Sequence, residues 1–243
     1  MVNKRLESLF GRSTGNFVLL FILVIGFSAC TGSGTVTENE DTSDTVEDGR
    51  SIEELERLFY ARQDSAKMNF TQADTDFMIG MIAHHAQALI MSRLAPENNA
   101  SSQVQTLAAR IINAQKDEIK TMQRWLEDRE QPVPEVHIEG LNLMIHGLEG
   151  HHADMDHSKM AGMLSDQQLR ELADAEGVEF DRLFLKYMIQ HHQGAVTMVD
   201  KLFSTDGAAQ DEGAFRLATD IQVDQKTEIA RMQLMLDEIT ASN

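Results

Sequence analysis

The sequence predicts an all-α protein, a four-helix bundle built from two copies of a helical hairpin. The 243-residue chain has 3 Pro, 14 Met and 6% aromatic residues, a composition that favours helices. An internal repeat divides most of the chain into two similar helix pairs. Two helix pairs are enough to form a four-helix bundle around one core.

The repeat is clearest in the first helix expected in each copy. Residues 74–91 read DTDFMIGMIAHHAQALIM, and residues 181–198 read DRLFLKYMIQHHQGAVTM. Both contain the pattern Met-x-x-His-His-x-x-Ala-x-x-Met at the same spacing. The second helices match at Ile, Glu, Ile and Met positions between residues 111–126 and 221–236. We therefore place repeat one at about 70–130 and repeat two at about 178–240.

The first 30 residues resemble a bacterial lipoprotein signal peptide. Basic residues precede a short apolar core at 17–29, which is shorter than the roughly 20 residues of a spanning helix. The only cysteine, Cys30, follows this core and precedes a Gly/Ser tract. We expect cleavage before Cys30, a lipid on Cys30, and attachment to a membrane of the cell envelope, facing the periplasm or the exterior. An ordinary signal peptide or an uncleaved anchor is the alternative.

A linker and a connector separate the predicted parts of the chain. Residues 31–50 are polar and acidic, which predicts a disordered linker before a helical domain at 51–243. The connector between the repeats, 131–177, contains the Met- and His-rich string HHADMDHSKMAGM. We expect a loop there, followed by a short capped helix that Gly177 ends.

Charge and motif content exclude several functions. The chain has 39 acidic and 21 basic residues, a formal net charge of −18, so nucleic acid is not an expected partner. Cys30 is the only thiol, and no Gly-rich phosphate loop precedes a helix. A di-iron bundle requires two Glu-x-x-His motifs. The chain has only the one at 149–152, in the expected loop, so we do not expect an enzyme.

Helical periodicity places the repeated histidines inside the bundle. At about 100° per residue, one helix face collects Asp74, Phe77, Met81, His84, His85, Ala88 and Met91. Glu118 lies on the inner face of the following helix, and Glu228 is its counterpart in the second repeat. A buried carboxylate without a partner is costly. Glu118 therefore needs His84 or His85, and Glu228 needs His191 or His192.

Two interpretations of these residues remain open. Methionines at helical spacing are usually core packing, and a buried His bonded to Glu satisfies both groups. The domain would then be a structural or protein-interaction module of the envelope without metal. Repetition of the motif and the separate Met/His cluster in the connector favour a metal site, although that connector is alternatively only a solvated loop.

Imidazole and thioether ligands together favour a soft or borderline metal ion. Cu(I) and Ag(I) accept methionine sulfur, whereas Zn(II) prefers His, Cys and carboxylate, and Ca(II) prefers oxygen. The prediction is copper, with Cu(I) favoured and Ag(I) and Cu(II) as alternatives. Because histidine ligands must be neutral, the affinity should fall as the pH drops below about 6.5.

The strings MAGMLSDQQLRELADAEGVE and FDRLFLKYMIQHHQGAVTM resemble the bacterial family called domain of unknown function 305. The resemblance covers about residues 70–240 and implies a ferritin-like helical bundle. Some members bind copper outside the cytoplasm through Met and His and are linked to copper or silver tolerance. Carried over by position, the implied ligands are Met81, His84, His85, Met91, Met188, His191, His192 and Met198, and less strictly Met155, His157, Met160 and Met163.

These observations predict an envelope-anchored protein that sequesters or delivers Cu(I) or Ag(I) in copper tolerance. Glu118 and Glu228 would orient the histidines from behind. The expected partners are metal ions, the membrane through the lipid on Cys30, and either an envelope protein or a second copy of the chain.

Overall fold

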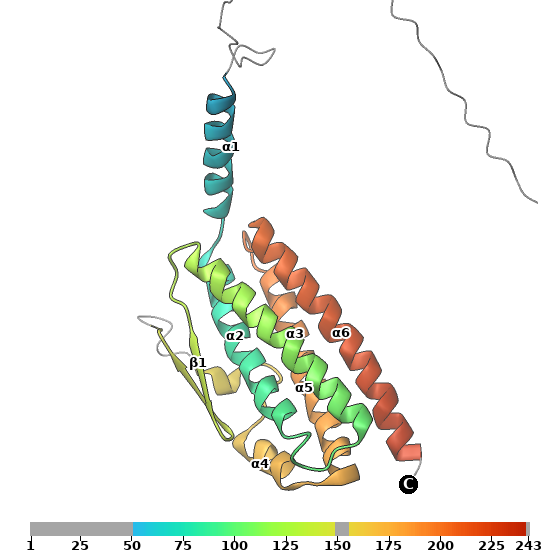
Figure 1. Ribbon diagram of the computed structural model, residues 1–243. Helices are drawn as coiled ribbons and strands as arrows, with labels where there is room; N and C mark the ends of the chain where they lie inside the picture. The colour runs from blue at the N-terminus through green and yellow to red at the C-terminus, as the bar shows by residue number, and fades with distance from the viewer. Residues whose placement is uncertain (1–50, 149–155, 242–243) are drawn as a thin grey trace, which may run out of the picture. The chain divides into compact units, whose positions relative to one another are not determined.

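The computed structural model describes residues 51–148 and 156–241 (Figure 1). The signal peptide, Cys30, the linker 31–50 and Met155 lie outside the described residues. The helices are α1 (Ile52–Lys67), α2 (Gln72–Arg93), α3 (Ser102–Glu127), α4 (Asp166–Asp174), α5 (Gly177–Phe203) and α6 (Glu212–Ala241). A short 3-10 helix, η2 (His157–Lys159), and two strands, β1 (Glu135–Glu139) and β2 (Asn142–His146), complete the fold.

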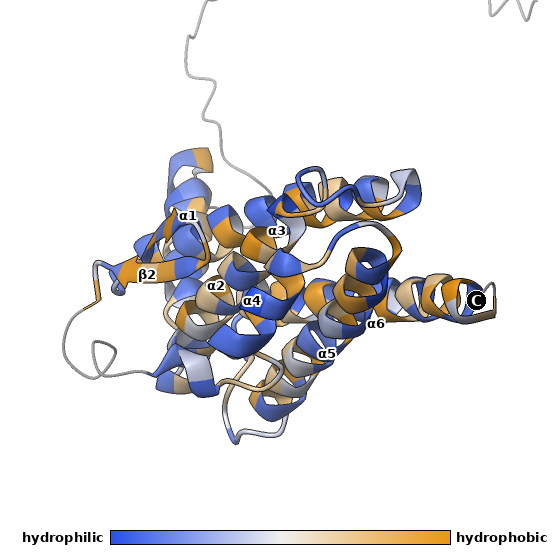
Figure 2. Ribbon diagram, turned by 90° about the horizontal axis from the view of Figure 1, so that it is seen from below, coloured by the Kyte–Doolittle hydropathy of each residue, from blue (hydrophilic) through white to orange (hydrophobic). Residues whose placement is uncertain are grey.

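Four of these helices form the predicted bundle. Helices α2 and α3 make one hairpin, α5 and α6 make the other, and α2 packs against α5 (Figure 1). Helix α4 lies at one end of the bundle and presents hydrophilic residues outward (Figure 2). The prediction of an all-α bundle with two repeated hairpins is confirmed. No helix in the described part of the chain is both long and apolar enough to cross a bilayer.

The central position of α2 follows from its sequence. Thr71 and Asp74 form a capping box at its start, and nearly every residue from Asp74 to Ser92 is buried. A helix that is apolar on all sides belongs in an interior rather than on a surface. Helix α3 instead has one apolar face, and Ser101 caps it by accepting a hydrogen bond from the Val104 N–H.

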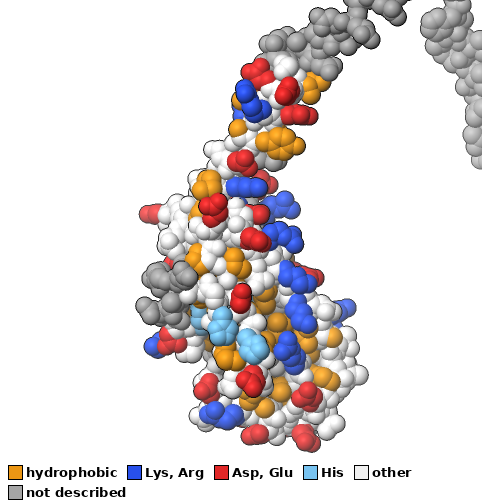
Figure 3. All heavy atoms as spheres, turned by 60° about the vertical axis from the view of Figure 1, so that its left-hand side comes forward, with side chains coloured by type: hydrophobic (Ala, Val, Ile, Leu, Met, Phe, Trp, Pro, Cys, Tyr) orange, Lys and Arg blue, Asp and Glu red, His pale blue; other side chains and the backbone are white. Residues whose placement is uncertain are grey.

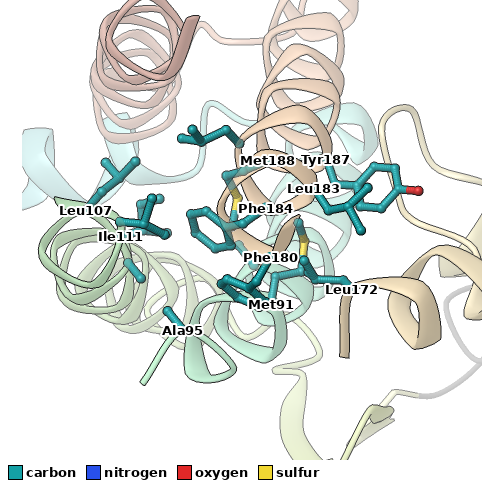
Figure 4. Close-up of a cluster of buried hydrophobic side chains, with 14 of the residues drawn as sticks. Met91, Ala95, Leu107, Ile111, Leu172, Phe180, Leu183, Phe184, Tyr187 and Met188 are labelled. Carbon is teal, nitrogen blue, oxygen red and sulfur yellow. The ribbon is translucent and has the colours of Figure 1, made fainter. Parts of the chain in front are cut away.

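Methionines of the repeated motif belong to the apolar core. Met91 and Met188 pack with Phe180, Phe184 and Leu172 in one cluster (Figure 4). Met81 belongs to a second cluster, and all three methionines are completely buried. Their burial among apolar side chains is sufficient to explain their presence.

Equivalent aspartates tie each repeat to a loop of the other. The Asp74 carboxylate accepts a 2.7 Å hydrogen bond from the Ala209 N–H, in the loop between α5 and α6. Its counterpart Asp181 accepts one of 3.1 Å from the Ser101 N–H, at the start of α3. The two repeats are therefore locked together reciprocally, through buried carboxylates at the beginnings of α2 and α5.

The prediction that the connector is a loop up to its short helix is wrong, because two strands follow its first four residues. Strands β1 and β2 pair antiparallel, with His137 opposite Met144, and lie beside α2. Gly140 has a φ of 60°, the left-handed conformation that this tight turn requires. The sequence EVHIE alternates in exposure, which is the period of a strand with one face covered, whereas the three central residues of NLMIH are all partly buried.

The short helix after the connector also ends earlier than predicted. Helix α4 ends at Asp174, and Ala175 and Glu176 are extended. Gly177 is the first residue of α5, and its N–H donates to the Asn98 carbonyl. Its φ of 59° lets the chain turn sharply into the long helix.

The reciprocal tie can be tested with Asp181→Ala. Losing this charged acceptor should lower the free energy of unfolding by about 1.5–3 kcal/mol, measured by urea denaturation. Asp174→Ala is the matched control, because Asp174 is exposed at the end of α4. Equal stabilities of the two variants would contradict the role assigned to Asp181.

Candidate metal centre

Four histidines meet in the middle of the bundle. Helix α2 contributes His84 and His85, α5 contributes His191 and His192, and none of the four has any exposed surface. The ring centroids of His84 and His191 are 3.8 Å apart, with the rings tilted by 36°. The structure thus brings together the two His-His pairs of the repeat.

The second histidine of each pair is held by a glutamate. His85 Nε2 lies 2.7 Å from Glu118 Oε2 on α3, and His192 Nε2 lies 2.6 Å from Glu228 Oε2 on α6. A carboxylate accepts from the ring N–H, so each glutamate fixes which nitrogen of its histidine carries the proton. Such an arrangement orients the opposite ring nitrogen as a ligand.

The first histidine of each pair has a different environment. His84 Nε2 donates to the Ala161 carbonyl at 3.0 Å, which leaves its Nδ1 with a lone pair. Neither ring nitrogen of His191 has a hydrogen-bond partner among the described residues. The Nδ1 atoms of His84, His85 and His192 are likewise buried without a partner there. Buried polar atoms are normally satisfied, so the unpartnered ring nitrogens of these four histidines are the unusual feature of the core.

Burial keeps the stacked histidines neutral. Loss of solvation, followed by the neighbouring His85, lowers the pKa of His84 to about 3. Loss of solvation, followed by His84, lowers the pKa of His191 well below its ordinary value. Both rings therefore have lone pairs available at neutral pH, the form that a metal ion requires.

Met198, the fourth methionine of the motif, is only partly buried. Met198 on α5 and Met160 of the connector approach each other over Gly80, where a Cβ atom would lie 3.4 and 3.3 Å from their ends. Both line a hollow of about 460 Å³ between α2 and α5. Gly80 is one helical turn before His84, so these two thioethers lie close to the histidine core.

A strap formed by residues 160–164 crosses the His84 side of the core. The Gln87 side chain accepts from the Leu164 N–H at 2.7 Å and donates to the Leu164 carbonyl at 3.0 Å. Gly194 touches the strap, because a Cβ there would lie 2.0 Å from the Ala161 oxygen. Gln87 and Gly194 occupy equivalent positions in the two repeats. Equivalent residues of the two repeats, one on α2 and one on α5, therefore both contact the strap.

The other connector residues lie elsewhere. His157 and Met163 line a hollow of about 590 Å³ together with His146 of β2. Burial lowers the pKa of the half-buried His157. Figure 3 shows histidine side chains at the surface on the face that carries the hairpin. The predicted ligands therefore divide between the buried core, the Met160–Met198 hollow and this outer hollow, and do not form one site.

Sequence reasoning missed a polar groove on the far side of the glutamates. Gln115, Glu118, Asp224, Gln225 and Glu228 line a hollow of about 290 Å³ between α3 and α6. Gln225 is the counterpart of Gln115 at the same offset of 110 that relates Glu228 to Glu118, so the repeat register could have identified it. Burial, and then the charges of Glu118 and Glu228, raise the pKa of Asp224.

Among the described residues, no three His, Asp or Glu side chains converge closely enough to hold one ion directly. A site built from the core imidazoles therefore offers few ligands.

The matching family model covers residues 74–236 and is described as "Domain of unknown function (DUF305)". The chain belongs to the DUF305 family. A DUF305 fragment from Deinococcus radiodurans is 30% identical, with a TM-score of 0.56, over 70% of this chain and 98% of that one. A DUF305 protein from Streptomyces coelicolor, 24% identical with a TM-score of 0.57 over 69% and 94% of the chains, has a similar fold.

One similar structure contains a metal. CopM in its Cu(II)-bound form is 29% identical, with a TM-score of 0.50, over 68% of this chain and 96% of that one. No functionally curated protein matches the sequence. The DUF305 fold is therefore established for this chain, and the similar protein CopM has been solved with Cu(II) bound.

Gly194→Ala tests the contact between the strap and α5. The added methyl group would overlap backbone atoms of Ala161 and Gly162, which cannot yield as a side chain can. We expect a loss of about 1–3 kcal/mol in the free energy of unfolding, measured by urea denaturation. Gly80→Ala is the control, because its Cβ meets only the flexible ends of Met160 and Met198. The contact is refuted if Gly194→Ala unfolds at the same urea concentration as Gly80→Ala.

The buried histidines predict a loss of stability in mild acid. Between the ordinary histidine pKa of 6.5 and the folded pKa of about 3, His84 is protonated in the unfolded chain but not in the folded one. Falling pH therefore favours unfolding across this window, by about 2 kcal/mol at pH 5 for one such group.

Urea denaturation at pH 6.5 and pH 5 should show a smaller loss for His84→Gln than for the wild type. His137→Gln, at an exposed position on β1, is the control and should leave the loss unchanged. If His84→Gln loses as much free energy of unfolding as the wild type between the two pH values, then His84 does not stay neutral in the folded protein.

Proposed function

We propose that this DUF305 protein binds copper, favouring Cu(I), and sequesters or delivers it outside the cytoplasm without catalysing a reaction. The observation that carries this proposal is the contact between His84 and His191. Two imidazoles from different repeats meet inside the bundle, with ring centroids 3.8 Å apart. His84 Nδ1 and both ring nitrogens of His191 have no hydrogen-bond partner among the described residues, so hydrogen bonding does not explain why these atoms are buried.

The chemistry of these groups suits a soft cation that accepts few ligands. The rings are neutral at physiological pH because burial lowers the pKa of His84 and His191. Since no third carboxylate or imidazole is close enough to ligate the same ion, Zn(II) and Ca(II) are disfavoured. Cu(I) and Ag(I) tolerate low coordination numbers and accept thioether sulfur.

The methionines nearest the core provide thioethers between the solvent and the histidines. Met160 and Met198 line an open hollow, and Met160 is next to Ala161, whose carbonyl binds His84. Copper would reach the core past these two sulfur atoms. Met81, Met91 and Met188 would act as apolar packing around it.

The relative CopM, whose structure has been solved in a Cu(II)-bound form, supports copper as the metal. A lipid on Cys30 and the linker 31–50 would attach the domain to a membrane and place it where copper enters the cell envelope. The net charge of −18 would raise the local concentration of cations. An envelope protein or a second copy of the chain would receive the copper.

A structural module without metal is the second candidate. Each glutamate already satisfies one nitrogen of its histidine, and three motif methionines fill the apolar core. In that case the histidines contribute only packing and hydrogen bonds, and an outer surface binds a protein.

Anaerobic titration of residues 51–243 with Cu(I), against a chromogenic chelator, distinguishes the two candidates. The wild type should compete for Cu(I), and the variant His84→Ala/His191→Ala should lose this competition. His137→Ala is the control for surface histidines and should bind like the wild type. If the double variant is poorly folded, Met160→Leu/Met198→Leu, which conserves volume, should still weaken binding.

The glutamates provide a second readout. Replacing an outer partner of a metal-binding histidine typically weakens metal affinity by about 10–100-fold, so we expect this for Glu118→Gln/Glu228→Gln. Wild-type protein that competes no better than the double histidine variant would refute copper binding and favour the structural module.

A further inference from the structure

Helix α1 lies outside the part of the chain that matches the family model, and its side chains are almost entirely exposed. It spans Ile52–Lys67, whereas the match begins at residue 74. None of its described side chains is buried, and only Leu55 is partly buried. A helix of 16 residues is marginal in water without tertiary packing, because helix nucleation is costly. Helix α1 therefore needs a packing partner.

The large aliphatic residues of α1 lie on one face of the helix. They follow one another at steps of three and four residues and form the α1 stripe, which consists of Ile52, Leu55, Leu58 and Phe59. Ile52 and Phe59 are each about half exposed. Three acids, Glu53, Glu54 and Glu56, lie in the same half of the helix. The α1 stripe is thus an uncovered apolar surface with an acidic rim.

Helix α6 carries a second uncovered stripe. Its members are uncharged, share one face at helical spacing and form the α6 stripe, which consists of Phe215, Thr219, Val223, Ala230 and Leu234. Phe215, Val223 and Leu234 are each more than half exposed. The Thr219 hydroxyl donates to the Phe215 carbonyl at 2.8 Å, so it is satisfied within the helix. The Phe203 ring lies 5.6 Å from the Phe215 ring and extends the stripe onto α5.

The two stripes match in length and in charge. At 1.5 Å per residue, the 16 residues of α1 span about 24 Å, and the distance along α6 from Phe215 to Leu234 is about 28 Å. Two exposed basic residues, Arg216 and Lys226, lie beside the α6 stripe, whereas the rim of the α1 stripe is acidic. Charges of opposite sign at the rim of an interface favour the pairing and set its orientation.

Within one chain, α1 does not cover the α6 stripe, whose apolar residues are exposed with α1 in place. The Phe70 ring packs against the Trp125 ring, 5.5 Å away, and anchors the chain that follows α1. Only Met68 and Asn69 separate α1 from Phe70. A connection this short favours packing on the next helix, α2, which is already buried along nearly its whole length. A second copy of the chain is therefore the better source of a cover.

We propose that the chain forms a two-fold symmetric dimer in which α1 of each copy packs on the α6 stripe of the other. The exchange is reciprocal, so it covers both stripes of both copies and makes each contact twice. Pairing α6 with α6 in antiparallel orientation would bring the Lys226 residues of the two copies together near the middle of the stripe. Pairing α1 with α1 in parallel would bring the two Arg62 residues together. Like charges across an interface are unfavourable.

The dimer does not depend on copper binding. The described residues that line the Met160–Met198 hollow come from α2, from the connector and from α5 with the residues just after it. The proposed interface uses α1 and α6, and Phe203 at the end of α5 is not among the residues that line the hollow. The hollow therefore stays open in the dimer, and each copy keeps its own access to the histidine core.

Sedimentation velocity of residues 31–243 over a range of concentrations tests the proposal. We expect a reversible dimer. Phe59→Glu places a charge in the α1 stripe and should weaken dimerisation at least about tenfold, because a buried aromatic anchor is lost and an acid is desolvated. Ala61→Glu adds the same charge at an exposed position on the opposite face of α1 and should dimerise like the wild type. A wild type that stays monomeric at every concentration would overturn the proposal.

Mixing two variants identifies which helices pair. Val223→Lys in the α6 stripe should be as monomeric as Phe59→Glu. An equimolar mixture of the two should form dimers, because one contact is then wild type and the other joins opposite charges. If Val223→Lys alone still dimerises, α1 pairs with α1, and if Phe59→Glu alone still dimerises, α6 pairs with α6. Either result contradicts the exchange.

The copper proposal is tested separately on the same variants. Phe59→Glu should compete for Cu(I) like the wild type, because Phe59 lies outside the histidine core and the hollow. His84→Ala/His191→Ala should keep the dimer. Loss of dimerisation in the folded double histidine variant would show that the interface depends on the core and would contradict the assignment to α1 and α6.

Discussion

The burial of four histidines between α2 and α5 constrains the rest of the structure. Burial lowers the pKa of His84 and of His191, so both rings stay neutral, and partners for the buried ring nitrogens must come from the surrounding elements. Glu118 and Glu228 supply partners from the outer helices, and the Ala161 carbonyl supplies one from the connector. The positions of α3, α6 and the strap relative to the central helices are therefore tied to the histidine core.

The strap makes the two repeats unequal. The core of repeat one is covered by residues 160–164, which Gln87 binds through both main-chain groups of Leu164. At the equivalent position of repeat two, only a glycine fits, because the strap backbone lies against α5. As a result His84 is held by a hydrogen bond while its counterpart His191 is not.

The repeat made the bundle predictable from the sequence. The offset between the two copies identified the four long helices, and periodicity placed Glu118 and Glu228 near the histidine pairs. The choice of His85 and His192 over their neighbours could not be predicted, because adjacent residues on a helix point only about 100° apart. It depends on how α3 packs on α2 and α6 on α5.

The connector and the methionines were less predictable. The alternation in EVHIE is short and NLMIH does not alternate, and the His-rich composition around these strands suggested a solvated loop. Methionine is equally suited to cores and to soft metals, so spacing alone could not separate the buried Met81 from Met198 beside the hollow. The polar groove was missed because Gln115 and Gln225 are uncharged, so their spacing did not indicate a site.

The most direct test of the copper site is a crystal structure of the domain loaded anaerobically with Cu(I), with anomalous data collected at the copper edge. The account predicts an anomalous peak within bonding distance of ring nitrogens of His84 and His191, with Glu118 and Glu228 still bonded to the neighbouring histidines. Copper found only on the outer Met and His residues of the connector, with no peak in the core, would contradict it.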